Sequence, residues 1–258
     1  MDSRTYYEKF DWEKANLSNK ISDKIDKIIA TIPSDVKSIL DVGCGDGTIT
    51  NSLYKKFFAV GLDRSVNALK FVQANKVSAS AAYLPFPDNS FDMIFSSEML
   101  EHLPDEIFYS AISEMKRVAR KYLFLTFPND ENIEKQVTKC PKCGYVFNKS
   151  YHLRTLNIDI AKKLFPEFRL VTKFEYGLKV RDYNRLLSKI KHKFTPAESW
   201  IPPFWTTKTG RKTMCPKCEY EFEIPYKFNL LAYSLDLLNI AISSKRHYQI
   251  CILLERNK

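Results

Sequence analysis

The chain has 258 residues, of which 45% are hydrophobic, and this excludes a disordered protein and allows one large domain or a domain with insertions. Its longest apolar run, residues 228–242, is interrupted by Asn229, Asp236 and Asn239, so it is too short and too polar to cross a bilayer. The net charge of +10 is concentrated in residues 181–217, where nine basic side chains stand against two acidic ones, which favours an anionic partner or a solvated basic surface.

Helical and strand-like segments alternate along most of the chain. Isoleucines recur at helical spacing in 17–31, which predicts a helix closed by Pro33. Short apolar runs predict strands, and amphipathic runs predict helices, in this order: strands 38–42 and 57–63, helix 65–76, strand 91–97, helix 106–120, strand 122–127, helix 156–165, strand 168–176, a long irregular stretch, a helix near 227–243 and strand 248–255. The alternation predicts an α/β fold with a doubly wound, mainly parallel sheet.

The segment LDVGCGDG (40–47) closes the first predicted strand and opens a helix. Its glycines, Gly43, Gly45 and Gly47, permit positive φ and a close approach of ligand to backbone. Asp63 ends the second strand, where a ribose diol sits in nucleotide-binding α/β units. The spacing is not the dinucleotide G-x-G-x-x-G, and Asp46 inside the loop would repel a pyrophosphate. Asp41, before the glycines, suits a ligand with a positively charged amino group, and S-adenosylmethionine carries one.

With these residues in place, the chain resembles the class I S-adenosylmethionine-dependent methyltransferases. The matching pieces are DVGCGDG (41–47), GLDRS (61–65), SAAYLPFPDNSFDMIFSSEMLEHLPD (80–105) and KYLFLTFPN (121–129). The resemblance spans about 37–180 and 226–258 and implies a Rossmann-like fold with a seven-stranded sheet and methyl transfer as the activity.

The resemblance also implies roles for individual residues. Asp41 and the backbone of Gly43–Gly47 would hold the methionine end of the cofactor, and Asp63 would bind its ribose hydroxyls. Arg64 would lie beside the adenine, and Ser97 under the methionine portion. Many relatives have Asp where this chain has Ser80, so the Ser80 hydroxyl and the Ala81 N–H would meet the adenine instead.

Two stretches of eleven residues, TKCPKCGYVFN (138–148) and TMCPKCEYEFE (213–223), share one pattern. Each C-P-K-C forms one metal knuckle, and two knuckles supply four thiolates for tetrahedral zinc: Cys140, Cys143, Cys215 and Cys218. Four cysteine ligands complete the coordination shell, so the zinc should be structural. Six cysteines with no secretory signal also suggest a reducing compartment, and we expect a cytoplasmic protein with no disulfides.

These motifs divide the predicted chain into three parts. Residues 1–36 would form a helical lid segment, and 37–129, 151–180 and 226–258 the cofactor-binding core. Residues 130–150 and 181–225 would be insertions joined by the zinc into one cap over the active site, because both leave the carboxyl edge of the parallel strands, where ligands bind.

The acceptor of the methyl group is less defined by the sequence. A base is needed for a hydroxyl acceptor, and His152 and His102 are the candidates. We expect O-methylation of a small molecule or glycan; the basic cap favours an anionic acceptor, such as a phosphorylated, nucleotide-linked or lipid-linked sugar. RNA is the second choice, although no N-P-P-Y-type motif follows the fourth strand, and a non-catalytic zinc-ribbon binding protein is the third. Trp200, Phe204 and Trp205 could stack on a sugar or base, touch a membrane interface, or form a small core of their own.

Overall fold

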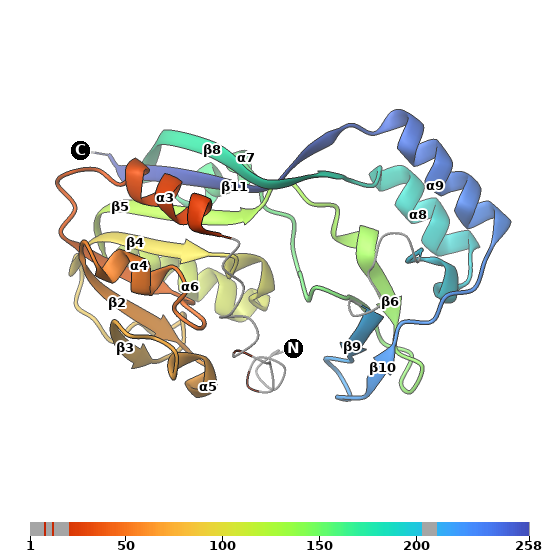
Figure 1. Cartoon of the computed structure of the whole chain (residues 1–258), viewed down its shortest axis with the longest axis horizontal. Helices are drawn as coiled ribbons and strands as arrows, with labels where there is room; N and C mark the ends of the chain where they lie inside the picture. Colours follow the sequence, from red (N-terminus) through yellow and green to blue (C-terminus); the bar gives the residue numbers. More distant parts are fainter. Residues whose placement is uncertain (1–7, 9–11, 13–20, 203–210, 258) are drawn as a thin grey trace. The chain divides into compact units, whose positions relative to one another are not determined.

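The computed structural model describes Glu8, Trp12 and residues 21–202 and 211–257 of the chain, which forms two compact units (Figure 1). The sheet unit comprises Arg4–Asn129, Leu156–Tyr176 and Gln249–Lys258. The cysteine unit comprises Asp130–Thr155 and Gly177–Tyr248, together with Met1–Ser3 outside the described residues. Of the predicted lid segment, residues 1–36, the structure describes residues 21–36 together with Glu8 and Trp12.

The sheet unit is built on seven strands in the order β3-β2-β1-β4-β5-β11-β8. Their bounds are β1 Ser38–Val42, β2 Phe58–Asp63, β3 Asn75–Ser78, β4 Phe91–Ser97, β5 Ala119–Pro128, β8 Phe168–Arg181 and β11 Lys245–Arg256. The strands from β3 to β5 pair in parallel, whereas β11 runs antiparallel to β5 with Gln249 opposite Pro128. This confirms the predicted α/β fold with a mainly parallel, seven-stranded, doubly wound sheet.

Helices cover both faces of this sheet (Figure 1). The residues of β1 alternate between the faces: Leu40 packs in a cluster with side chains of α6 (Asp105–Val118) and α7 (Ile158–Leu164). Ile39 packs in a second cluster with α3 (Ser22–Thr31) and α4 (Thr50–Tyr54). The two-residue period of a strand therefore gives both faces of the sheet an apolar core.

The predicted helix 65–76 is wrong beyond its first turn. Helix α5 covers only Val66–Leu69, capped by the Ser65 hydroxyl, and the chain then turns into β3. The Asn51 side chain explains the stop, because its amide donates to the Phe71 carbonyl (3.2 Å) and its oxygen accepts from the Gln73 N–H (2.7 Å). These bonds satisfy backbone groups that a longer helix would use internally.

In its described residues, the cysteine unit contains two small hairpins and two longer helices. Strands β6 (Val137–Lys139) and β7 (Val146–Asn148) form one hairpin, and β9 (Lys212–Met214) and β10 (Glu221–Glu223) the other. The longer helices are α8 (Arg185–Phe194) and α9 (Leu230–Ile242), and the short 3-10 turns are η2 (Ile133–Gln136) and η3 (Ala197–Ser199). Helix α8 lies in the stretch that the sequence left irregular, and its start is marked by Asn184, whose side chain accepts from two backbone N–H groups.

Helix α9 packs on α8 through a small apolar core and a buried ion pair. Leu235 joins Tyr183 and Leu187 in the core. The Lys191 ammonium lies 2.6 Å from the Asp236 carboxylate, which also accepts from the Tyr183 hydroxyl at 2.9 Å. Residues 226–248, which the sequence assigns to the cofactor-binding core, lie in the compact cysteine unit, whereas Gln249–Lys258 lie in the sheet unit.

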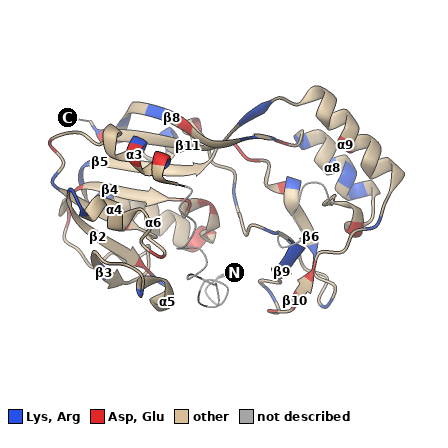
Figure 2. Ribbon diagram, in the orientation of Figure 1, with Lys and Arg blue, Asp and Glu red and all other residues tan. Residues whose placement is uncertain are grey.

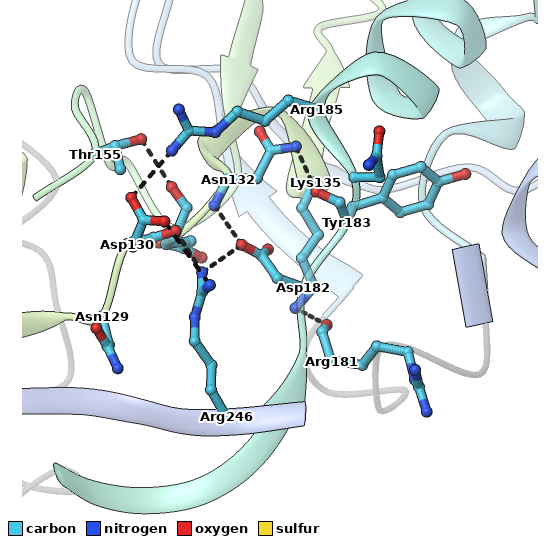
Figure 3. A network of polar contacts seen from close by, with 12 residues as sticks. Asn129, Asp130, Asn132, Lys135, Thr155, Arg181, Asp182, Tyr183, Arg185 and Arg246 are labelled. Atoms are coloured by element: carbon cyan, nitrogen blue, oxygen red, sulfur yellow. Dashed lines mark hydrogen bonds and ion pairs between the residues drawn. The ribbon is translucent and has the colours of Figure 1, made fainter. Parts of the chain in front are cut away.

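A polar network holds together the segments of the cysteine unit that adjoin the sheet unit in sequence (Figure 3). Arg246 donates to the Asp182 carboxylate at 2.6 Å, and the same carboxylate accepts from the Asn132 N–H at 2.9 Å. Nearby, Lys135 donates to the Arg181 carbonyl at 2.8 Å. Three chain segments far apart in sequence are thereby fixed to one another.

The aromatic residues around the Pro pair and the longest apolar run are the two segments for which the sequence raised the question of membrane contact. The Trp200 indole donates to the Thr195 carbonyl at 3.1 Å and its ring lies 4.6 Å from that of His192, so Trp200 contributes to a small core of the unit. Phe204 and Trp205 lie outside the described residues. Within the described ranges, none of the helices is long and apolar enough for a membrane span.

Candidate functional site

The turn between β1 and α4 is shaped by three glycines. Gly43, Gly45 and Gly47 have φ values of +78°, +54° and +76°, which other residues rarely adopt. A Cβ on Gly43 would lie 2.5 Å from Cγ of Met99, and one on Gly47 2.8 Å from Cγ2 of Val72. The Gly43 N–H donates to the Leu62 carbonyl at 2.8 Å, which joins the turn to the end of β2. Glycine is therefore required for backbone conformation and for space.

Asp41 lies at the base of this turn and is almost fully buried. One oxygen, Oδ2, accepts from the Thr50 hydroxyl at 2.6 Å, while Oδ1 has no hydrogen-bond partner among the described residues. Burial raises the pKa of Asp41 to about 7; repulsion from Asp63 adds to the rise, and the Thr50 hydroxyl opposes it. A buried carboxylate oxygen without a donor is suited to a cationic ligand group.

Asp63 ends β2 beside the same turn. Its two oxygens accept from the backbone N–H groups of Gly45 and Ser65, each at 2.8 Å. Burial raises the pKa of Asp63, although these backbone hydrogen bonds counteract the rise. Each carboxylate oxygen has a second lone pair, so Asp63 can still accept from a ligand hydroxyl.

Two described residues of the N-terminal segment lie against this part of the sheet unit. A Cβ built on Gly45 would be 3.1 Å from Cζ3 of the Trp12 ring. The Glu8 carboxylate accepts from the Val66 N–H at 3.2 Å. An indole beside the glycine turn provides an apolar surface next to the two acids.

The other residues that the resemblance singled out also follow parallel strands. Arg64 directly follows β2. Ser80 comes after β3, and its hydroxyl accepts from the Ala82 N–H at 3.2 Å, so the Ser80–Ala81 backbone is held in a turn. Ser97 ends β4, and its hydroxyl lies 2.7 Å from that of Thr126 on β5. The structure thus brings the predicted cofactor residues to the carboxyl edge of one sheet, where α/β proteins bind ligands.

One charged residue at this edge, Lys24, was not among the residues predicted from the sequence. Lys24 on α3 is 3% exposed, and its ammonium lies 3.4 Å from the hydroxyls of both Ser97 and Thr126. In the part of the chain that the structure describes, its contacts are these hydroxyls rather than a carboxylate, and full burial of a lysine is uncommon without an ionic partner. The sequence does contain one indication that Lys24 is buried: it stands four residues before Ile28, on the apolar side of the predicted helix.

The four cysteines of the repeated pattern converge in the cysteine unit. Their sulfur atoms all lie within 4.8 Å of one another, with Cys140 to Cys218 at 3.7 Å and Cys143 to Cys215 at 3.6 Å. These separations are too long for a disulfide, whose sulfurs lie about 2 Å apart. They match the edges of a tetrahedron with zinc–sulfur bonds of about 2.3 Å. The donor set and its spacing therefore fit a zinc ion.

The two C-P-K-C knuckles have the same backbone geometry. The Cys140 N–H donates to the Tyr145 carbonyl at 2.8 Å, and the Cys215 N–H donates to the Tyr220 carbonyl at 2.9 Å. The residue after each second cysteine has positive φ: Gly144 at +72° and Glu219 at +55°. The repeat is thus structural as well as sequential.

The shared lysines and tyrosines link the two knuckles reciprocally. The Lys142 ammonium lies 5.7 Å from the centre of the Tyr220 ring, and that of Lys217 lies 5.9 Å from the Tyr145 ring. Each lysine is therefore over the aromatic ring of the other half, in a cation–π arrangement. This accounts for the recurrence of residues that bind no metal.

The two candidate bases lie in different units, and each is described within its own. His152 is buried in the cysteine unit, and its Nδ1 is hydrogen-bonded to the Glu131 carboxylate. A carboxylate on Nδ1 orients the ring and favours the tautomer with the proton on that nitrogen. His102 belongs to the 3-10 turn η1 (Leu100–His102) in the sheet unit, and its N–H donates to the Met99 carbonyl at 3.0 Å.

A parallel sheet with a glycine turn after its first strand and an acid ending the second defines a nucleotide-binding α/β protein. Residues 40–125 match a family model described as a methyltransferase domain. A ubiquinone/menaquinone biosynthesis C-methyltransferase of Rickettsia bellii is 31% identical over 195 residues, which cover 62% of this chain and 76% of that protein. The chain therefore belongs to the class I S-adenosylmethionine-dependent methyltransferases.

Other matches are more distant or cover less of the relative. An uncharacterized protein of Methanocaldococcus jannaschii is 31% identical over 132 residues, or 49% of this chain and 56% of that protein. The chain thus spans about half the length of this curated relative. The crystal structure of an S-adenosylmethionine-dependent methyltransferase from Archaeoglobus fulgidus has a TM-score of 0.56 and 16% identity, with 98% of each chain covered, so it shares the fold.

Proposed function

We propose that this methyltransferase acts on an anionic small molecule or glycan, most simply at a hydroxyl oxygen. The observation that carries the cofactor assignment is the buried Asp41 oxygen without a donor, which suits the amino group of S-adenosylmethionine. Gly43, Gly45 and Gly47 would bring the backbone close to the methionine end, and Asp63 would accept from the ribose hydroxyls. The cofactor supplies an electrophilic methyl group when bound.

Further residues at the sheet edge complete the proposed cofactor site. The buried Lys24 ammonium beside Ser97 would bind the methionine carboxylate, so that Asp41 and Lys24 together recognise a zwitterion. Arg64, Ser80 and Ala81 would border the adenosine, and the Trp12 ring would exclude water from the glycine turn. In-line methyl transfer depends mainly on such alignment and on exclusion of water.

We propose that Cys140, Cys143, Cys215 and Cys218 hold one structural zinc that joins the insertions 130–150 and 181–225. Such a joined pair would act as a cap on the acceptor side. Four thiolates leave no open coordination position, so the metal would stabilise the fold rather than activate the acceptor.

The acceptor is proposed from charge and from the candidate base. The basic residues of 181–217 favour an anionic group. His152, oriented by Glu131, is the first candidate to take a proton from an acceptor hydroxyl, with His102 as the second. The C-methyltransferase name of the Rickettsia relative leaves a carbon acceptor as the alternative atom, and the same basic residues leave RNA as the alternative substrate.

Asp41 gives cofactor binding a pH dependence. Its folded-state pKa of about 7 exceeds the ordinary 3.8, so its charging removes stability from the free protein as pH rises from about 4 to about 7. A bound ammonium group offsets this loss, so the rise in Tm caused by S-adenosylmethionine should increase between about pH 6 and pH 8. In Asp41→Asn, the rise in Tm caused by S-adenosylmethionine should be small and should not change with pH. Asp46→Asn, in the same loop, should behave as the wild type; a flat wild-type profile would refute the role of Asp41.

The zinc assignment predicts one metal ion per chain, measured by elemental analysis. Cys215→Ser/Cys218→Ser should lose it and should also destabilise the first knuckle, because both knuckles share one ion. Cys44→Ser, outside the cluster, should retain it. Wild-type protein without zinc, or the double variant with full zinc, would contradict the assignment.

A general-base role predicts that His152→Ala lowers kcat by roughly 10²- to 10⁴-fold while the Kd for S-adenosylmethionine is unchanged. Glu131→Gln should lower kcat less and shift its pH profile, because the carboxamide still holds the ring. His247→Ala is the matched control, since the Nδ1 of His247 makes an exposed hydrogen bond with the Gly177 carbonyl rather than with a carboxylate. An unchanged rate in His152→Ala would exclude this role.

Radiolabelled cofactor separates the acceptor classes in a fractionated cell extract. We expect label in the small-molecule or glycolipid fraction. An RNA substrate would instead take up label and would bind with a steep salt dependence, with a log–log slope of about −0.7 per phosphate contacted on a single strand. Label in RNA that is lost in Arg211→Glu/Lys212→Glu would overturn the proposed acceptor.

A further inference from the structure

Helix α9 turns polar residues inward and aliphatic residues outward. Its buried positions include Asp236 and Asn239. Its outer side carries Tyr233, Ser234 and Ala241 together with six aliphatic side chains that are 43–70% exposed: Leu230, Leu231, Leu237, Leu238, Ile240 and Ile242. Figure 2 shows the helix almost free of charged residues, in contrast to α8. This distribution is the reverse of that of an ordinary surface helix.

Polar contacts prevent α9 from turning its aliphatic side inward. Asp236 is the counter-ion of the buried Lys191, at 2.6 Å. The Asn239 side chain accepts from the Asn184 N–H at 2.8 Å and donates to the Asp182 carbonyl at 3.1 Å. Rotation of the helix would separate the buried Lys191 ammonium from its carboxylate and would break the two hydrogen bonds of Asn239, which is strongly unfavourable. The exposed aliphatic side is therefore a fixed feature of the unit.

Exposed cations flank this apolar surface at both ends. Between Ile224 and Tyr248 the only acid is the buried Asp236, whereas Lys227 precedes the helix and Lys245 follows it, both exposed. Phe228, beside Lys227, is 61% exposed. On the neighbouring helix α8, Lys189 and Lys193 are exposed as well. The surface thus combines aliphatic and aromatic side chains with a positive border.

We propose that α9, with Phe228, Lys227 and Lys245, binds the surface of an anionic lipid bilayer. Aliphatic side chains on a helix of this kind enter the boundary between headgroups and acyl chains, and lysines at its border contact anionic headgroups. At 13 residues α9 is shorter than the roughly 20 that a membrane span requires, so the helix lies in the plane of the interface. A contiguous set of exposed aliphatic side chains on a protein surface is typical of an interaction site.

Charge favours lipid over a second copy of the chain as the occupant. If two α9 helices packed side by side in parallel, Lys227 would meet Lys227, and in the antiparallel arrangement Lys227 would meet Lys245. Like charges at an interface disfavour association, whereas an anionic surface attracts both lysines at once. The inference concerns attachment alone and holds whichever acceptor the enzyme methylates.

The test is sedimentation of the full chain with vesicles of phosphatidylcholine alone or mixed with phosphatidylglycerol. We expect binding to the mixed vesicles that weakens with salt. Leu237→Gln/Leu238→Gln should lower the partition coefficient by about tenfold or more, because two aliphatic side chains no longer enter the bilayer. Leu178→Gln is the matched control, since Leu178 is 83% exposed in the same unit but lies on β8.

Charge is tested separately with Lys227→Glu/Lys245→Glu, which should lower partitioning into the mixed vesicles by about tenfold or more. Lys55→Glu/Lys56→Glu changes net charge equally on exposed residues of the sheet unit and should bind as the wild type. Circular dichroism checks that each variant is folded. No binding of the wild type, or binding that the leucine variant leaves unchanged, would overturn the proposal. A stable dimer that the leucine variant dissociates, without vesicle binding, would also overturn it and assign the surface to a second copy.

Discussion

The electrostatic constraint on which the sheet unit depends is the burial of the Asp41 carboxylate beneath the glycine turn. Charging this group in the folded protein costs on the order of 4 kcal/mol, judged from the rise of its pKa to about 7. The Thr50 hydroxyl compensates one oxygen only. The turn around it needs glycine for both φ and space, so the backbone is fixed close to the acid. A cationic group bound at this point would relieve the cost and be aligned by it.

In the cysteine unit, the main structural constraint is the pairing of the two equivalent C-P-K-C knuckles. Two hairpins far apart in sequence place four sulfur atoms within 4.8 Å of one another. The lysine of each knuckle also lies over the tyrosine ring of the other knuckle. The polar network around Asp182 and Arg246 then fixes to one another the segments at which the chain enters and leaves the cysteine unit in sequence. Because the apolar core between α8 and α9 is small, these cross-links contribute much of what holds the unit together.

Much of the fold and of the candidate site could be predicted because the signals are local. The strands, the glycine turn and the paired cysteines are read directly from period and spacing. Lys24 and Thr126 could not be found in this way, because their proximity to Ser97 depends on strand order. The short α5 was missed because Asn51, distant in sequence, bonds the backbone that follows it. The packing of α9 on α8 could not be predicted, because it depends on contacts of Asp236 and Asn239 with residues about 50 positions earlier in the sequence.

The most direct test of the central claim is a crystal structure of the full chain with S-adenosylhomocysteine, which retains the amino group and the ribose. We predict that the amino nitrogen lies within about 3 Å of Asp41 Oδ1, and that the ribose hydroxyls donate to Asp63. A ligand whose amino group lies away from Asp41, or that binds elsewhere than the glycine turn, would contradict the account.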